Sequence, residues 1–320
     1  MNKINLLIGL LVICLTGNVH AIFDENGKFE ETWDYDWIGS DEVPAGRWTM
    51  WPSGSYQPKN GEYSQTTPEA KNPLSSGRNG LRLWYPDSTG TPGPASSSPA
   101  TPFISFNGPQ PELWLRFYMR YQEGFRWWEG NPPGYDKLFR LWTHTHGGDP
   151  NVMAHLGSGN RLGVALEYSI TPSQYASGKG WYPTFSDNGS TSHGRWVAYE
   201  MHIKMESAPY AADGELRVWL NGELLIENTS MIYVNPDANT QGTPEAQLAG
   251  WVHTHVSNQD FVQNAVGPIG RNVAYVDFDD IVIYNQTPPN VDAHGNPFIG
   301  PIGWDGTPIL LPPKLLPVVE

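Results

Sequence analysis

Histidines spaced two residues apart beside a tryptophan occur twice in this chain of 320 residues. The two segments are Trp142-Thr143-His144-Thr145-His146 and Trp251-Val252-His253-Thr254-His255, and they hold four of the nine histidines. Both are rich in Thr, Val and Trp, which favour β-strands. Alternate side chains of a strand share a face. We therefore expect Trp, His and His of each segment on one side, with the histidines about 6.6 Å apart.

The first segment extends backwards into a longer predicted strand that begins near Lys137. Alternation places Arg140 on the face of Trp142 and puts Lys137 on the opposite face. Lys137 would reach the histidine face only from the entry of the strand or through a β-bulge. The expected catalytic surface unites residues of both segments, namely Arg140, Trp142, His144 and His146 with Trp251, His253 and His255.

A third predicted strand, Glu112–Tyr121, alternates between an apolar and a mixed face. The apolar face is formed by Leu113, Leu115, Phe117, Met119 and Tyr121. The other face mixes aromatic rings with guanidinium groups, as sugar-binding surfaces do, and consists of Trp114, Arg116, Tyr118 and Arg120. We expect this face, together with Trp142 and Trp251, to bind substrate, although the same pattern also suits an ordinary solvated face.

Arginine and histidine on one surface suit proton abstraction next to a carboxylate. Arginine binds a carboxylate bidentately, and histidine exchanges protons near neutral pH. A second interpretation is a metal site, because a His-x-His strand can place two imidazoles on one cation. A third is that the histidines are structural. Asp277, Asp279 and Asp280 could bind Ca²⁺ through oxygen, but a polar strand edge explains them equally simply.

The first 21 residues predict an export signal, with Lys3 before an apolar run and a small-residue cleavage site ending at Ala21. The run is too short to span a membrane. Cys14, the single cysteine, lies inside this signal, so the mature chain would have no disulfide. We expect a secreted or periplasmic protein that is a monomer. The formal net charge of −14 argues against nucleic-acid binding but permits a locally basic cleft.

Short strands separated by turn signals predict an all-β protein, a jelly-roll β-sandwich with long loops. The clearest hairpin is residues 213–225, where Asn221-Gly222 forms the turn. We expect a single domain over residues 22–286, with the strongest strand signals from residue 112. Residues 287–320 form a Pro-rich tail, whose apolar residues suggest that it packs along the domain.

Residues 110–285 resemble the concanavalin A-like jelly-roll polysaccharide lyases of the alginate and glucuronan lyase type. The resemblance is carried by Leu113–Leu141 with Asp136-Lys137-Leu138-Phe139, by Trp196–Lys204, by Asp213-Gly214 with Trp219-Leu220-Asn221-Gly222, and by Asp277–Ile281. It implies β-elimination of an acidic, uronate polysaccharide on a concave sheet, without a cofactor, and it makes Lys137 a catalytic candidate. The alternative is a non-catalytic, lectin-like module, because fold alone does not decide function.

Overall fold

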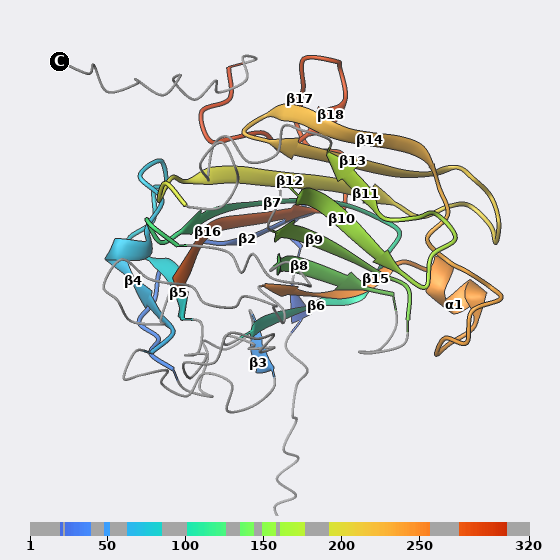
Figure 1. Cartoon of the computed structure of the whole chain (residues 1–320), viewed down its shortest axis with the longest axis horizontal. Helices are drawn as coiled ribbons and strands as arrows, with labels where there is room; N and C mark the ends of the chain where they lie inside the picture. Colours follow the sequence, from blue (N-terminus) through green and yellow to red (C-terminus); the bar gives the residue numbers. More distant parts are fainter. Residues whose placement is uncertain are drawn as a thin grey trace, which may run out of the picture.

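The computed structural model describes residues 20–21, 23–39, 48–51, 63–84, 101–125, 135–143, 149–157, 161–176, 192–256 and 275–305. Two eight-stranded sheets stack in it as a β-sandwich (Figure 1). The predicted all-β jelly-roll sandwich is confirmed. Helical structure among the described residues is limited to the single turn η1 (Pro68–Ala70) and the short helix α1 (Pro244–Leu248). Within the same residues, no helix has the length and apolar character needed to cross a membrane.

The first sheet is antiparallel except where β1 runs parallel to β6. Its strands, in spatial order, are β1 (His20–Ala21), β6 (Thr101–Gln110), β15 (Trp251–Val256), β8 (Tyr135–Trp142), β9 (Asn151–Gly157), β10 (Arg161–Glu167) and β11 (Gln174–Ala176), and β3 (Thr49–Trp51) also pairs with β6.

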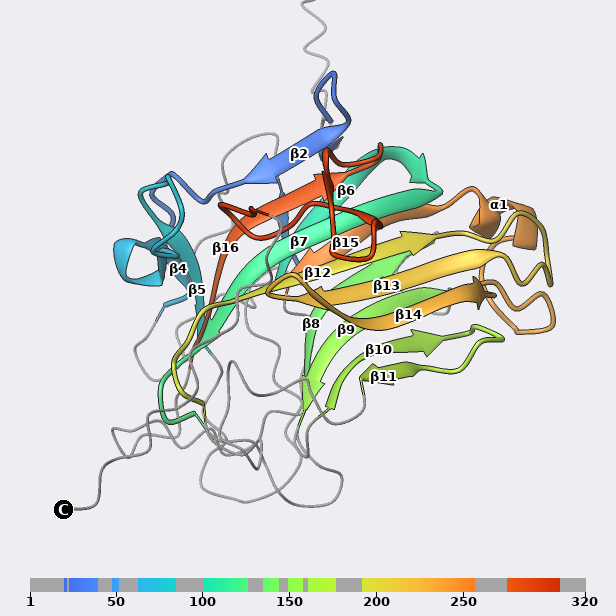
Figure 2. The ribbon, with the colours of Figure 1, turned by 90° about the horizontal axis from the view of Figure 1, so that it is seen from above.

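The second sheet is antiparallel throughout. Its strands, in spatial order, are β14 (Glu223–Met231), β13 (Gly214–Leu220), β12 (Val197–Lys204), β7 (Glu112–Tyr121), β16 (Tyr275–Tyr284), β5 (Gly80–Trp84) and β4 (Gln65–Thr67), and β2 (Lys28–Glu31) also pairs with β16. A separate pair, β17 (Asn290–Val291) and β18 (Pro297–Phe298), lies beyond this sheet on the side away from the first sheet (Figures 1 and 2).

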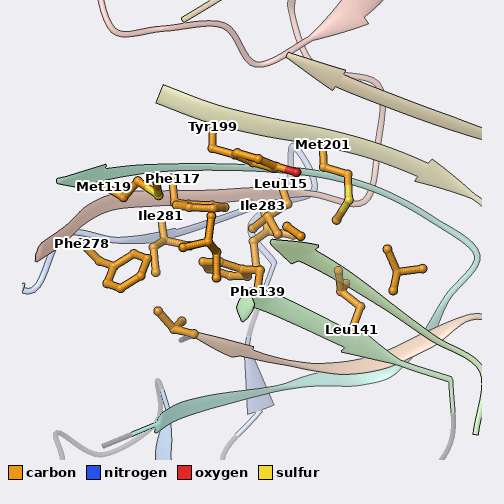
Figure 3. Close-up of a cluster of buried hydrophobic side chains, with 14 of the residues drawn as sticks. Leu115, Phe117, Met119, Phe139, Leu141, Tyr199, Met201, Phe278, Ile281 and Ile283 are labelled. Carbon is orange, nitrogen blue, oxygen red and sulfur yellow. The ribbon is translucent and has the colours of Figure 1, made fainter. Parts of the chain in front are cut away.

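The core fills the space between the two sheets (Figure 3). Phe117 of β7 stacks on Phe139 of β8 with ring centroids 4.3 Å apart, so the two sheets meet directly through their central strands. Every second residue of β7 from Leu113 to Tyr121 belongs to this core, as alternation predicts. The packing also fixes which side chains of each sheet point outward.

The hairpin between β13 and β14 turns at the predicted Asn-Gly pair. Asn221 has φ 50° and Gly222 has φ 85°, the left-handed conformations that a two-residue turn of this kind requires. The Asn221 side chain accepts a hydrogen bond from the backbone N–H of Ala198 at 2.8 Å. A Cβ on Gly222 would lie 2.6 Å from the Trp304 ring. Glycine is therefore required by both the turn and the packing.

Several irregularities interrupt the regular ladders of the described strands, and three of them bear on the residues singled out in the sequence. In β8 the pairing shifts between Lys137 and Phe139. In the β15–β6 pair it shifts between Trp251 and His253. In β16 it shifts beyond Asp279, and the next residue, Asp280, has φ 47°. At each of these three positions, strict alternation does not give the face on which the neighbouring side chains lie.

Candidate functional site

The outer face of the first sheet carries four of the six proposed catalytic residues. On β8, Phe139 and Leu141 point into the core (Figure 3), so Arg140 and its neighbour Trp142 belong to the outer face. His253 and His255 of β15 pair directly with Trp142 and Arg140. Directly opposed residues of antiparallel strands share a face. The fourth, Lys137, reaches this face through a bulge, and His144 and His146 lie outside the described residues.

The bulge in β8 brings Lys137 to the outer face. Lys137 pairs with His155, and Phe139 pairs with the next residue along β9, Ala154, so Leu138 is an extra residue in the ladder. Leu138 and Phe139 both lie in the core. This doubling shifts the phase of the strand by one residue. Strict alternation placed Lys137 on the opposite face, and the bulge is the physical reason that this prediction was wrong.

The strand registers arrange the outer face in three rows that cross the sheet. The first row is Lys137, His155, Gly163 and Tyr175. The second row is Phe103, His255, Arg140, Met153 and Ala165. The third row is Ser105, His253, Trp142, Asn151 and Glu167. The rows contain two cations and one carboxylate, a locally basic surface on an acidic protein.

Contacts with three residues that the structure describes fix the guanidinium of Arg140. Its Nε donates to Asn151 Oδ1 at 3.0 Å, and its Nη2 donates to Glu167 Oε2 at 2.6 Å. Its central carbon lies 3.8 Å from the centroid of the Trp142 ring, a cation–π contact. Asn151 Nδ2 also donates to Glu167 Oε2 at 3.1 Å, which closes the network. Arg140 is therefore held in one orientation before any ligand arrives.

Trp142 supports Arg140 in this network. Its side chain is 1% exposed, and the Arg140 guanidinium covers its ring. The rings of His253 and His255 each lie 6.3 Å from the Trp142 ring, centroid to centroid. The Arg140 guanidinium thus covers the ring that would stack on a sugar, and the sugar-stacking role of Trp142 stays a prediction.

The histidine pair of β15 packs around Phe103. The centroid of the Phe103 ring lies 4.6 Å from that of His253 and 4.7 Å from that of His255. The two imidazoles are 5.7 Å apart. His253 is 7% exposed and His255 is fully buried. The two histidines share the predicted face. Because they are buried, they line the candidate site and expose little surface to solvent.

Trp251 does not share the face of these histidines. It is fully buried in the core, where its ring meets the Tyr233 ring edge-on with centroids 5.4 Å apart. The ladder is irregular between Trp251 and His253, because Trp251 pairs with Gln110 while His253 pairs with Ser105. Alternation therefore does not carry through the segment, and the predicted sugar-stacking role of Trp251 was wrong.

Two residues of the first row, His155 and Tyr175, escaped the sequence analysis. Their rings lie 5.4 Å apart and meet edge-on, and Tyr175 is 52% exposed while His155 is 7% exposed. Gly163 separates them in the row, and a Cβ there would lie 2.5 Å from the Tyr175 ring. The glycine allows the phenol ring to lie across β10 toward His155. Neither residue stands in a recognisable motif, so only the register brings them to Lys137.

The proposed substrate-binding face of β7 lies on the other sheet and is covered by the C-terminal segment, residues 287–305. Trp114 Nε1 donates to the carbonyl of Pro297 at 3.0 Å. Arg116 Nη1 donates to the carbonyl of Gly300 at 3.1 Å, and the hydroxyl of Tyr118 accepts from the N–H of Ile302 at 2.7 Å. This face therefore binds the chain itself. Its prediction as a substrate surface beside the histidines was wrong.

Arg120, the last of the β7 set, pairs with a buried carboxylate. Its guanidinium and that of Arg82 both donate to Asp277, which is fully buried. Asp279 accepts from the backbone N–H groups of Asn72 and Asp280, each at 2.8 Å. Burial, with the Asp280 charge as a smaller cause, raises the pKa of Asp279 to about 8. Asp277 and Asp279 thus bind groups of the second sheet and of the segment beside it.

The described residues contain no group of three His, Cys, Asp or Glu suited to a metal.

No protein-family model matches the chain, and no curated protein sequence matches it. Jelly-roll alginate and glucuronan lyases are among its structural neighbours. The alginate lyase Aly36B is 13% identical with a TM-score of 0.47, covering 81% of this chain and 96% of its own. For the endo-β-1,4-glucuronan lyase of the fungus Trichoderma reesei the values are 14%, 0.45, 81% and 95%. For the alginate lyase of Aplysia kurodai they are 12%, 0.38, 68% and 85%. At this identity the likeness concerns the fold.

Proposed function

We propose that this protein is a secreted or periplasmic polysaccharide lyase that cleaves a uronate polysaccharide by β-elimination on the outer face of the first sheet. The observation that carries the proposal is the first row, where Lys137, His155 and Tyr175 lie at one level of three strands. The second row adds the fixed guanidinium of Arg140. Cations, a base and an acid are the groups that this elimination needs.

The chemistry divides among these side chains according to their usual charge. Lysine and arginine are cations at neutral pH, so Lys137 and Arg140 neutralise the uronate carboxylate and make the C5 proton acidic. A neutral imidazole accepts a proton, so His155 is the base that removes it. The C5–H electrons form the C4–C5 double bond, and the C4–O bond breaks. Tyr175 donates its hydroxyl proton to the leaving oxygen, because a phenol is protonated at neutral pH.

The test is to incubate the purified protein with alginate, glucuronan and other uronate polymers and to follow ultraviolet absorbance of the unsaturated product. We expect absorbance to rise with at least one polymer and to remain flat with the Lys137→Met variant. Retention on a uronate column without any unsaturated product would replace the lyase with a glycan-binding module. Neither product nor retention with any uronate polymer would overturn both assignments.

A further inference from the structure

A cavity of about 250 Å³ opens on the outer face of the second sheet, on the opposite side of the sandwich from the three rows. Its buried floor comes from β7, β16 and the C-terminal segment and consists of Arg116, Asp280, Val282 and Ile299. Its rim comes from β2 and from residues 74–76. Ligand pockets for drug-sized molecules usually measure about 300–1,000 Å³. This cavity therefore suits one small ring.

Arg116 supplies hydrogen-bond donors of fixed geometry to the cavity. The side chain is 6% exposed. Its Nη1 donates to the backbone carbonyl of Gly300 at 3.1 Å and its Nη2 to that of Asp280 at 3.2 Å. A guanidinium carries five N–H groups. Its Nε is buried and, among the described residues, finds no hydrogen-bond partner, so it does not serve a ligand. The two carbonyls orient the fork and use one N–H each of Nη1 and Nη2, which leaves the second N–H of each nitrogen for a ligand.

Acceptors in the cavity balance these donors. On the rim, Glu30 pairs with Lys28 at 2.7 Å and its side chain is 45% exposed. At the floor, the Asp280 carboxylate accepts from Ser75 Oγ at 3.0 Å and Asn72 Nδ2 at 3.1 Å, which anchors residues 72–75 beside the opening. Two cations and two carboxylates line the cavity, so a ligand with a net charge gains no advantage there. Neighbouring donors and acceptors match hydroxyl groups, which act as both.

The apolar part of the cavity completes the match. Val282 and Ile299 form part of the buried floor, and Leu74 at the rim is 53% exposed. Aliphatic side chains pack against the C–H groups of a pyranose ring, while its hydroxyls turn toward the polar groups. We infer that this cavity is a second carbohydrate site, which binds one neutral hexopyranose residue independently of the proposed active face.

The experiment titrates the intact protein with the methyl glycosides of glucose, mannose and galactose and follows binding by saturation-transfer NMR. The Ser76→Trp variant places an indole at the exposed rim, and Ser230→Trp, at an exposed serine of β14, is its matched control. We expect saturable binding of at least one glycoside by the wild type and by Ser230→Trp, and its loss in Ser76→Trp. No saturable binding of any glycoside, or equal binding by Ser76→Trp and the wild type, would overturn the inference.

Two further measurements keep this site separate from the proposed lyase face. Lyase activity of Ser76→Trp on the polymer that the wild type cleaves should be unchanged, because the rim lies on the other sheet. Free glucuronate should bind the cavity no more tightly than glucose, because Glu30 and Asp280 offset the cations. A clear preference for glucuronate that disappears in Ser76→Trp would show a carboxylate site and refute the neutral-sugar assignment.

Discussion

Two outer faces of this sandwich carry nearly the same residue types, and only one of them has an arrangement that suits chemistry on a substrate. On the second sheet, β7 presents tryptophan, arginine, tyrosine and arginine. On the first sheet, the rows of β8, β9, β11 and β15 present lysine, arginine, tryptophan, histidine and tyrosine. The β7 side chains bond to the backbone of the C-terminal segment and to Asp277. Composition of a face is therefore a poor guide to its use.

The partners of each face explain the difference. The carboxylate of Glu200 on β12 accepts from the backbone N–H groups of Ile299 and Gly300 at 2.5 and 2.8 Å. These bonds hold the C-terminal segment against the outer face of the second sheet. Arg140 of the first sheet is instead held by the side chains of Asn151 and Glu167, beside the row that contains Tyr175. Most polar groups of the β7 face are thus used to hold the C-terminal segment, whereas the side-chain network around Arg140 orients a surface for another molecule.

The largest expected difference between the faces appears when one tyrosine hydroxyl is removed from each in turn. Tyr175→Phe should lower kcat/KM on the uronate polymer by about 10²–10⁴-fold, the usual worth of a positioned proton donor. Tyr118→Phe should leave kcat/KM unchanged, because its hydroxyl bonds to Ile302 of the same chain. Initial rates of unsaturated product measure both. Equal losses in the two variants would mean that the faces do not differ as the geometry indicates.

The second effect should fall on stability and on the opposite face. Glu200→Ala leaves the buried N–H groups of Ile299 and Gly300 without their acceptor. Unsatisfied buried donors should lower the free energy of unfolding by about 2–4 kcal/mol. Urea denaturation measures this loss, and the folded variant should keep the kcat/KM of the wild type. A variant that unfolds at the wild-type urea midpoint would show that the C-terminal segment is not held through Glu200.

Most of the fold could be predicted from the sequence, because local patterns determine it. The predicted strand Glu112–Tyr121 has the bounds of β7, and the Asn221-Gly222 turn lies where the dipeptide indicates. Alternation also placed Arg140, His253 and His255 correctly on one face. Each of these features depends on residues that are neighbours in the chain.

The rest of the candidate site depends on features that no short segment contains. The extra residue Leu138 moves Lys137 to the outer face, and nothing in its identity distinguishes a bulged leucine from a paired one. His155 and Tyr175 meet Lys137 only through the registers of four strands. Trp114 is covered by a residue 183 positions away. Register, bulges and distant covering are tertiary properties, so periodicity could not predict them.

The third prediction concerns pH and belongs to the second sheet. Burial raises the pKa of Asp279 to about 8 and that of Glu200 to about 7, from ordinary values of 3.8 and 4.5. The folded chain therefore keeps protons that the unfolded chain has released, and stability from these groups declines as pH rises from about 4 to about 8. Carboxyls with lowered pKa values, such as Glu215 and Asp292, titrate below this window. The melting temperature should fall between pH 5 and pH 8.

The matched variants for this measurement are Glu200→Gln and Asp279→Asn, which cannot ionise. Each should be less stable than the wild type at pH 5, because an amide keeps only one acceptor oxygen for two N–H donors. Each should also show a smaller decline in melting temperature up to pH 8. A wild-type melting temperature that rises over this range would show that neither carboxyl keeps its proton.

The smallest effect tests how the first sheet prepares Arg140. Glu167→Gln keeps the shape of the side chain and removes the negative charge of the carboxylate whose Oε2 accepts from Arg140 Nη2 at 2.6 Å. The Glu167 side chain is 41% exposed, so solvent screening reduces the worth of this ion pair. KM for the uronate polymer should rise about two- to five-fold with little change in kcat, because Asn151 and Trp142 still hold Arg140. A fall in kcat at unchanged KM would instead place Glu167 among the groups that act on the reacting atoms and not among those that orient Arg140.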